Sequence, residues 1–406
     1  IIDTMVHITN KSDCCGCAAC EQICPKNCIT MTQDSEGFLY PTVDENACVN
    51  CGRCDSVCPI HNKREAHSLL KAFAFNLKDK EARYESASGG FFTAIATHVI
   101  KSGGVAFGVA FNSKMQAVTT FTEKENDIQK FRNSKYVQSI IGDSYKQVKN
   151  FLKQGRLVLF SGTPCQVQGL LNFLGKTYDN LLTMDFVCHG VPSPKVFEKY
   201  KLYLENYHKG KLTNYIFRTK RKGYNGNVCS CASAVFDDGS IIKTEELGSN
   251  FRFMKEAFFA EISSRPICHQ CSFKDKERVS DFTVFDCWSV KKMAPQLSDG
   301  LGTSLLVVNS ENGEQLIPQL EKYSLMKVVD LDRAILLDGL VMLHSVPAHP
   351  RRKEFFGDLD TLTIEQLMDK YLTPKGMAKI KIYVRDFLDH LGLLRYIRHI
   401  KYNLKK

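Results

Sequence analysis

The chain has 406 residues, 44% apolar and 24% charged, and its formal net charge is +10. The first residues lack the basic and apolar segments of a secretory signal, and no stretch approaches the roughly 18 uncharged apolar residues of a membrane span. We therefore expect a soluble cytoplasmic protein with two or three domains. In that reducing compartment, metal binding is a better explanation for 17 cysteines than disulfides.

Six of the cysteines lie within residues 12–28, where a C-x2-C-x2-C-x3-C-P run begins. The run recurs 34 residues later, cysteine for cysteine. This repeat is typical of two-cluster bacterial ferredoxins, in which the fourth cysteine of each run binds the cluster of the other. The sequence therefore predicts two 4Fe-4S clusters, one held by Cys14, Cys17, Cys20 and Cys58 and the other by Cys48, Cys51, Cys54 and Cys24.

A structural zinc site is the alternative, but zinc sites usually use two C-x2-C pairs rather than two such quadruplets. Cys15 and Cys28 lie outside the ligand spacing, and we expect both to pack beside the clusters as small buried apolar residues. Residues 29–45, between the runs, read as a β-hairpin around Gly37.

From residue 69 onward, strand-like and helix-like segments alternate. Strands are predicted at 71–77, 104–111, 156–160, 180–188 and 278–288, helices at 86–103, 143–155 and 166–176, and several short strands within 210–245. Alternation of this kind predicts an α/β domain with functional loops at the carboxyl ends of its strands.

Cysteines in this second region indicate a third metal site. Cys165 lies in a strand-to-helix loop, Cys188 ends a strand, and Cys268 and Cys271 form a C-x2-C pair. Four thiolates suit a cubane or a zinc ion equally by number, but the neighbouring ferredoxin pattern favours a cubane. The competing ligands are Cys229 and Cys231, and Cys287 is expected to be a buried strand residue.

The stretch "SASGGFF" places small residues and two glycines at the start of a predicted helix. Backbone N–H groups at such a position bind anions, which would suit a flavin pyrophosphate, although a plain turn has the same signature. "GGVAFG" does not fit the dinucleotide-binding fingerprint.

Seven stretches together resemble the coenzyme F420 hydrogenase/dehydrogenase beta-subunit family: "SASGGFFTAIA", "RNSKYVQS", "LFSGTPCQVQGL", "DFVCHGVPSP", "FRTKRKGY", "RPICHQCSFK" and "SDFTVFDCW". The chain is most similar to bacterial members with a fused N-terminal ferredoxin domain, over roughly residues 12–310. The resemblance implies an iron-sulfur flavoprotein that carries FAD. Archaeal relatives exchange hydride with coenzyme F420, plant and cyanobacterial relatives reduce chlorophyll precursors, and bacterial relatives often lie in polysaccharide-synthesis gene clusters.

The resemblance also implies roles for particular residues. It assigns Cys165, Cys188, Cys268 and Cys271 to the family's own cluster. Where the family usually reads G-D-F-W, this chain has Phe285, Asp286, Cys287 and Trp288, which puts the flavin approach in doubt. The residues that match the family's flavin-contacting segments are Ser88, Gly89 and Gly90, and Ser134, Lys135 and Tyr136.

We expect a ferredoxin or similar donor to load the N-terminal clusters, and flavin to couple them to hydride transfer with a small-molecule substrate, in either direction. His189 and Asp286 are the candidate proton donors. Histidine beside a ligand more often orients the site, and a strand carboxylate is more often exposed to water. Residues 220–222, Lys-Arg-Lys, would bind an anionic substrate or form a solvated loop.

Residues 375–406 contain nine lysines and arginines against Asp386 and Asp389, interleaved with apolar residues. This pattern indicates a basic amphipathic helix that either contacts the inner membrane surface or a partner, or caps the fold with its lysines in solvent. Nucleic-acid binding is not indicated, because no binding motif accompanies the charge.

The predicted fold class is α+β/α/β, with four parts: a two-cluster ferredoxin-like domain at 1–62, a mixed α/β flavin domain at 63–150 and 151–335 that carries the third cluster, and a helical extension at 336–406. Three functions fit: a flavin-dependent reductase, an electron-transfer subunit whose partner carries the catalytic site, and, least well, an iron-sulfur sensor or assembly component. A flavin site separates the first two from the third, and a substrate cavity at the flavin separates the first from the second.

Overall fold

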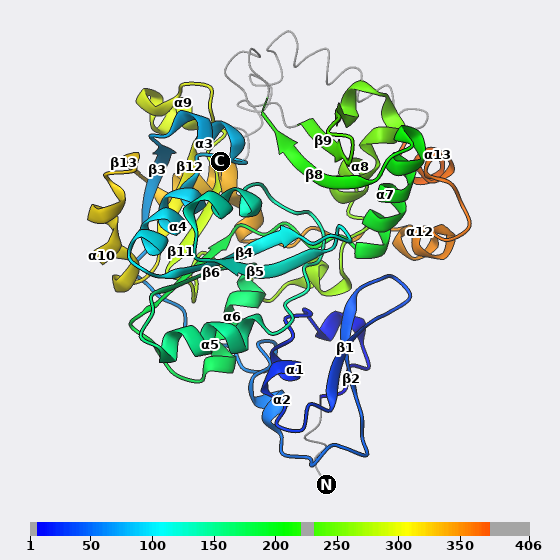
Figure 1. Ribbon diagram of the computed structural model, residues 1–406, viewed down its shortest axis with the longest axis horizontal. Coiled ribbons are helices and arrows are strands. Elements are labelled where there is room, and N and C mark those ends of the chain that lie inside the picture. Colours follow the sequence, from blue (N-terminus) through cyan, green and yellow to red (C-terminus); the bar gives the residue numbers. More distant parts are fainter. Residues whose placement is uncertain (1–5, 221–230, 374–406) are drawn as a thin grey trace, which may run out of the picture. The chain divides into compact units, whose positions relative to one another are not determined.

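The computed structural model describes residues 6–220 and 231–373 (Figure 1). The chain divides into two units, residues 1–352 and residues 353–406. The predicted basic tail at 375–406, Cys229, Arg221 and Lys222 lie outside the described residues. No helix among the described residues is long and apolar enough to cross a membrane.

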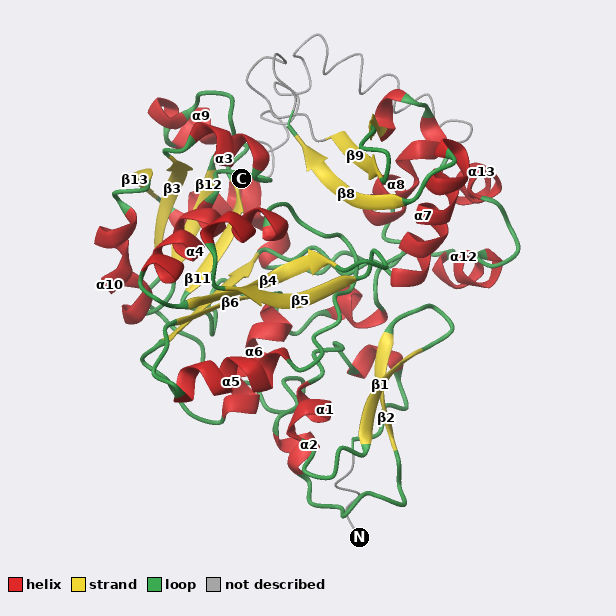
Figure 2. Ribbon diagram, in the orientation of Figure 1, coloured by secondary structure: helices red, strands yellow, loops and turns green. Residues whose placement is uncertain are grey.

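The N-terminal part of the first unit contains the predicted hairpin and two short helices (Figure 2). Strands β1 (Ile29–Gln33) and β2 (Leu39–Val43) pair antiparallel, with Ile29 opposite Val43. Helix α1 (Ala19–Ile23) carries Cys20 of the first run, and helix α2 (Arg53–Ser56) carries Cys54 of the second. Ala18 and Gly52, which precede these helices and are 34 residues apart, both have left-handed backbones (φ 60° and 70°), so the repeat recurs in conformation as well as in sequence.

Most of the remaining chain forms an eight-stranded mixed sheet in the order β13-β3-β12-β11-β7-β6-β4-β5. Strands β4, β6, β7 and β11 are mutually parallel, and the others pair antiparallel. The strands are β3 (Lys71–Leu77), β4 (Val105–Phe111), β5 (Ala117–Thr122), β6 (Val158–Ser161), β7 (Leu181–Phe186), β11 (Phe282–Asp286), β12 (Ser304–Val308) and β13 (Ser324–Val329).

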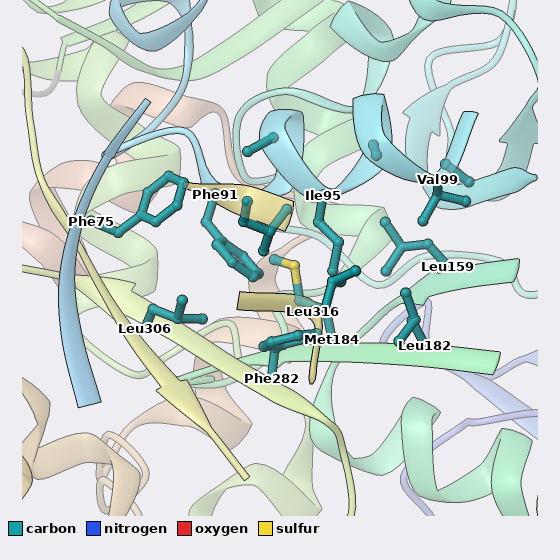
Figure 3. Close-up of a cluster of buried hydrophobic side chains, with 14 of the residues drawn as sticks. Phe75, Phe91, Ile95, Val99, Leu159, Leu182, Met184, Phe282, Leu306 and Leu316 are labelled. Carbon is teal, nitrogen blue, oxygen red and sulfur yellow. The ribbon is translucent and has the colours of Figure 1, made fainter. Parts of the chain in front are cut away.

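Helices cover both faces of this sheet, because alternate strand residues point to opposite sides. On one face Leu182, Met184 and Phe282 pack against Phe91, Ile95 and Val99, which lie on one side of α4 (Figure 3). On the other face Phe107, Phe160 and Leu181 pack against α5 and α6. The helices are α3 (Lys80–Glu85), α4 (Phe91–Lys101), α5 (Ser144–Lys153), α6 (Pro164–Leu174), α9 (Val290–Met293), α10 (Glu311–Leu320) and α11 (Leu331–Ala334).

A second, three-stranded antiparallel sheet has the order β10-β9-β8. Its aromatic face, which includes Tyr215 and Phe217, packs against Phe197 and Tyr200 of the adjoining helix. The elements are β8 (Leu212–Thr219), β9 (Cys231–Phe236), β10 (Ile241–Lys243), α7 (Pro194–His208) and α8 (Phe253–Phe259). The second unit contains most of α12 (Arg352–Asp358), together with α13 (Ile364–Leu367) and a π-helix (Met368–Leu372), held by rings such as Phe355 and Tyr371.

The ferredoxin-type domain and the mixed α/β sheet domain confirm the predicted fold class at this level. The predicted strands and helices between residues 29 and 288 are present, but several have other ends than expected: α4 begins at Phe91, for example, and β11 spans only Phe282–Asp286. Strand β7 ends at Phe186, so Cys188 lies two residues beyond it. Helix α6 begins at Pro164, so Cys165 lies in its first turn rather than in the preceding loop.

Buried carboxylates of the sheet give a testable pH dependence. Burial raises the pKa of Asp185, although Arg278 and a hydrogen bond from Thr283 oppose the shift. Because the pKa of Asp185 is higher in the folded state than in the unfolded state, the folded protein binds the proton more tightly. The resulting stabilisation is complete below the unfolded pKa of about 4 and is lost as the pH rises through the folded pKa. Relative to wild type, Asp185→Asn should therefore gain stability in urea unfolding between pH 5 and pH 8.

The matched control is Asp281→Asn in the same network. The Asp281 carboxylate accepts hydrogen bonds from Thr183 N and Thr183 Oγ1, both at 2.7 Å, and from Ser310 Oγ at 2.5 Å. Its replacement should cost about 1–3 kcal/mol throughout this pH range. If the difference between Asp185→Asn and wild type does not change with pH, burial does not control the titration of Asp185.

Candidate functional site

The second N-terminal cysteine set lines one cavity. Its empty volume is about 350 Å³, and Lys26, Val49 and Arg53 are among the other lining residues. Three of the cysteines come from the second run and one from the first, which is the exchange that the doubled pattern predicts. The four are Cys24, Cys48, Cys51 and Cys54.

The other N-terminal set gathers around Cys20 of α1. Cys14 and Cys58 are electrostatic neighbours of Cys20, and Cys17 is a neighbour of both Cys14 and Cys20. Burial, followed by these neighbours, raises the pKa of Cys20 far above its usual range. Iron binding must displace the thiol protons, so it would be coupled to proton release.

Among the described residues, no three His, Cys, Asp or Glu side chains gather as they would around a single metal ion. A cubane takes one thiolate at each iron, so its ligands stand farther apart than those around one ion. A cavity lined by the four thiols of this set, with Cys28 beside Cys24 as a fifth lining cysteine, suits that arrangement, so the residues present fit a 4Fe-4S cluster.

The third set meets where parallel strands end. Cys165 follows β6, and Cys188 follows β7, its neighbour in the sheet. Cys268 and Cys271 belong to a 3₁₀ turn (Pro266–Gln270) and the residue after it. Cys188 has each of the other three cysteines as an electrostatic neighbour, so the structure brings the predicted quartet together. Cys231 instead lies in β9, opposite Thr219.

Positive groups surround this quartet. Cys165 lies at the amino end of α6, where Thr163 and Gln166 form a capping box and the helix dipole favours negative charge. The Lys274 ammonium donates to the carbonyl oxygens of Cys188 (2.5 Å) and Val341 (2.7 Å). These charges would stabilise the anionic thiolates of a cluster.

A pocket of about 430 Å³ contains Ser88 and Asp286. Ser88 Oγ donates to Thr303 O (2.9 Å), and Gly89 N donates to Ser304 Oγ (2.9 Å). Gly90 caps α4 with a left-handed backbone (φ 86°). This loop lies at the junction of β3, β12 and α4, as expected for an anion-binding helix start.

The predicted segment Ser134, Lys135 and Tyr136 lies beside this loop. Arg132 pairs with the Glu85 carboxylate, and Asn133 Nδ2 donates to Glu85 O (2.9 Å). Lys135 does not project toward a ligand: its ammonium donates to the carbonyls of residues 130, 132 and 133, and burial lowers its pKa to about 7.

Buried polar atoms without a partner gather around these two loops. Among the described residues they include Arg83 Nε, Arg132 Nε and Asn133 Oδ1. An unpaired buried polar group is costly, and the two arginine N–H donors, unlike the Asn133 oxygen, would suit a phosphate-bearing ligand beside Ser88. The donor set is therefore compatible with FAD, whose flavin would couple one-electron and two-electron chemistry.

Asp286 is not a solvent-exposed strand residue, contrary to the general expectation. Both of its carboxylate oxygens accept from the Arg218 guanidinium, at 2.8 and 3.1 Å. The guanidinium also lies 5.2 Å from the ring centre of Trp288. A carboxylate that accepts two such bonds is better placed to orient Arg218 than to donate a proton.

His189 pairs with Glu261, which is 3% exposed, and its ring lies 4.9 Å from that of Phe258. The pairing suits an orienting role beside Cys188. Lys220 is neither in a solvated loop nor open to a substrate. It is 4% exposed and donates to the carbonyls of Arg83, Ser88 and Leu301, and burial lowers its pKa to about 7.

Sequence reasoning missed Arg218, Glu261 and Arg83 as site residues. Arg218 was present in a quoted stretch, but its partner Asp286 is 68 residues away. Cys287 is buried as expected, although it lies one residue beyond β11. Phe285, which stands where the family has glycine, packs toward Gly339, and a methyl group added at Gly339 would lie 2.9 Å from the Phe285 ring.

Two segments of the chain match known protein families. Residues 13–62 match the 4Fe-4S dicluster domain, and residues 155–334 match the family model for the C terminus of the coenzyme F420 hydrogenase/dehydrogenase beta subunit. No curated protein matches the chain significantly.

One similar solved structure is a chain of the F420-reducing [NiFe] hydrogenase complex from Methanosarcina barkeri. It is 14% identical with a TM-score of 0.42, and the match covers 75% of this chain and 91% of that one. The two family matches indicate an iron-sulfur redox protein that is related to the coenzyme F420 hydrogenase/dehydrogenase beta subunit over residues 155–334 and to 4Fe-4S dicluster domains over residues 13–62.

Proposed function

We propose that the protein is an iron-sulfur flavoprotein oxidoreductase. Two N-terminal 4Fe-4S clusters exchange electrons with a ferredoxin or similar carrier, a third cluster relays them, and FAD exchanges hydride with a small-molecule substrate. The proposed ligands are Cys14, Cys17, Cys20 and Cys58 for the first cluster, Cys24, Cys48, Cys51 and Cys54 for the second, and Cys165, Cys188, Cys268 and Cys271 for the third.

One observation carries the proposal: a continuous series of contacts joins the third cysteine set to the Ser88 pocket. His189 follows Cys188 and contacts the Phe258 ring, and that ring lies 4.9 Å from the ring of Tyr136. The Tyr136 ring also packs against the ring of Phe217, the residue before Arg218, and Arg218 holds Asp286 at the pocket wall. A cluster and a flavin at the two ends would therefore be neighbours within one packed site.

In this proposal the chain's own residues bind and orient. Ser88, Gly89 and Gly90 hold the cofactor phosphates, Arg83 and Arg132 supply unpaired donors beside them, and Arg218 and Trp288 form the wall of the pocket. His189, held by Glu261, remains the candidate proton carrier, while Asp286 fixes Arg218.

The second candidate is a non-catalytic electron-transfer subunit of a larger redox complex. It is favoured by the exposed rim of the second cavity, where Cys51 is exposed and Val49 is 55% exposed, as a partner-facing cluster would require. In that case FAD would still bind, but the chain alone would not turn over a hydride substrate.

The test is to measure iron, acid-labile sulfide and flavin per chain after purification without oxygen. Three cubanes and one flavin predict about twelve irons and one FAD. About eight irons without flavin would contradict the relay and leave only the dicluster domain. Full occupancy without hydride exchange in a substrate screen would favour the electron-transfer subunit.

A further inference from the structure

Cys15 lies between two of the proposed cluster sites. Its half-buried side chain packs against the apolar cluster that contains Cys17 of the first N-terminal set and Val167 and Leu170 of α6, and the first turn of α6 carries Cys165 of the third set. The doubled cysteine pattern does not use Cys15 as a ligand. Its position therefore links two cysteine sets that belong to different domains.

Two glycines allow this close approach. A methyl group on Gly169 of α6 would lie 3.0 Å from both Cβ and Sγ of Cys17. A methyl group on Gly16, whose φ is +72°, would lie 2.4 Å from Gln138 Nε2. Real Cβ atoms rarely approach other atoms so closely, so larger residues at either position would separate the cysteine loop from the sheet domain. Figure 1 shows α1 beside α6 in the same region.

Arg265 ties the loop of the third set to the loop of the first. The residue is 1% exposed, lies three positions before Cys268, and donates to Cys14 O (2.8 Å) and Leu39 O (2.9 Å). Its guanidinium lies 4.0 Å from the ring centre of Tyr40. A buried arginine with these partners fixes the relative position of the two loops.

We infer that electrons cross between the domains at Cys15, directly from the first N-terminal cluster to the third cluster. This inference rests on the proposed function. In the crossing step the reduced first cluster loses one electron and the oxidised third cluster gains it, and no bond forms or breaks. A reduced one-electron carrier restores the electron through the second cluster, whose Cys51 is exposed.

Cys15 acts in this scheme as a positioning residue. Electrons tunnel faster through bonded and packed atoms than across a gap, and removal of a buried side chain leaves part of its volume empty. Cys15→Ala should therefore slow the crossing, while Cys15→Ser, which keeps a hydrogen-bonding atom at the same place, should retain most of the rate.

The experiment mixes oxidised holoprotein with a dithionite-reduced bacterial ferredoxin and follows cluster and flavin absorbance by stopped flow. We expect Cys15→Ala to keep wild-type iron and flavin contents and the fast reduction of the N-terminal clusters, with flavin reduction slowed severalfold. Equilibrium dithionite titrations should reach the same end point in each variant. Cys231→Ala, a buried cysteine of β9, is the control and should reduce like wild type.

Equal flavin reduction rates in wild type and in a fully loaded Cys15→Ala variant would overturn the crossing at Cys15 but leave the proposed function intact. A wild-type protein with only about eight irons would instead refute the third cluster, and the proposed function with it. If Cys15→Ala loses iron, Cys15→Ser replaces it as the test. A Cys15→Ser variant that keeps its full iron content but reduces its flavin severalfold more slowly than wild type would refute a role for the bridging contact.

Discussion

Cys268→Ser is expected to lower the iron content from about twelve to about eight atoms per chain, because a cubane without one of its thiolates is not retained. The Cys268 thiol is buried beside Cys165 and Cys271, and burial, the main cause, raises its pKa to about 12. Such a buried group is ionised at neutral pH only when metal replaces its proton. Iron and sulfide analysis, together with the cluster absorbance, measures the loss.

The matched control is Cys231→Ser, which tests the competing ligand of the sequence interpretation. Cys231 is 2% exposed and Cys268 is half-buried, so neither substitution places the hydroxyl on an open surface. We expect Cys231→Ser to retain about twelve irons. Loss of four irons in the Cys231 variant, with none lost in the Cys268 variant, would show that Cys231 rather than Cys268 is the cluster ligand.

Gly89→Ala should have the largest effect on stability. A methyl group at Gly89 would lie 2.2 Å from Phe75 O and 2.4 Å from Ser304 N, both backbone atoms of paired strands. Neither atom can rotate away, so β3 and β12 must separate locally or the loop must shift. We expect a loss of about 3 kcal/mol or more in urea unfolding, and lower flavin content because Ser88 moves as well.

Gly357→Ala provides the control for this substitution. Gly357 lies in α12, and a methyl group there would meet nothing within 4 Å. Alanine favours helix over glycine by up to about 1 kcal/mol, so this variant should be neutral or slightly more stable than wild type. Similar midpoints for Gly89→Ala and wild type would show that the loop relaxes without strain.

Local patterns account for the features that the sequence predicted well. The hairpin between the cysteine runs and helix α4 follow from residue spacing within a single segment. The position of β3 between β12 and β13 could not be read in this way, because antiparallel pairing across more than 200 residues leaves no local signal. The same holds for the three carbonyls around Lys220, which come from α3, the Ser88 loop and the loop that contains Leu301.

The cysteine sets show the same difference between features that local spacing predicts and features that depend on distant residues. The spacing of eight cysteines identified the dicluster domain, and the ends of neighbouring parallel strands explain why Cys165 and Cys188 meet. The packing of Cys15 against the cluster that includes α6 depends on how the two domains dock, which the spacing does not encode. Asp286 was selected by its position in the chain, but its role depends on Arg218, which only the folded structure brings beside it.

The tip of the β1–β2 hairpin is also held by contacts with residues 193, 195 and 352. Lys195 Nζ donates to Ser35 O (2.9 Å), Arg352 binds both oxygens of the Glu36 carboxylate, and Ser193 Oγ bonds to Glu36 O. Together with the Arg265 contacts, this gives the dicluster domain two separate points of attachment. A domain attached in this way does not act as a swinging arm that visits successive partners. In the proposed relay, each transfer between the clusters and the flavin would then be first order, so its rate would not depend on protein concentration, whereas the encounters with the carrier and with the substrate would depend on their concentrations.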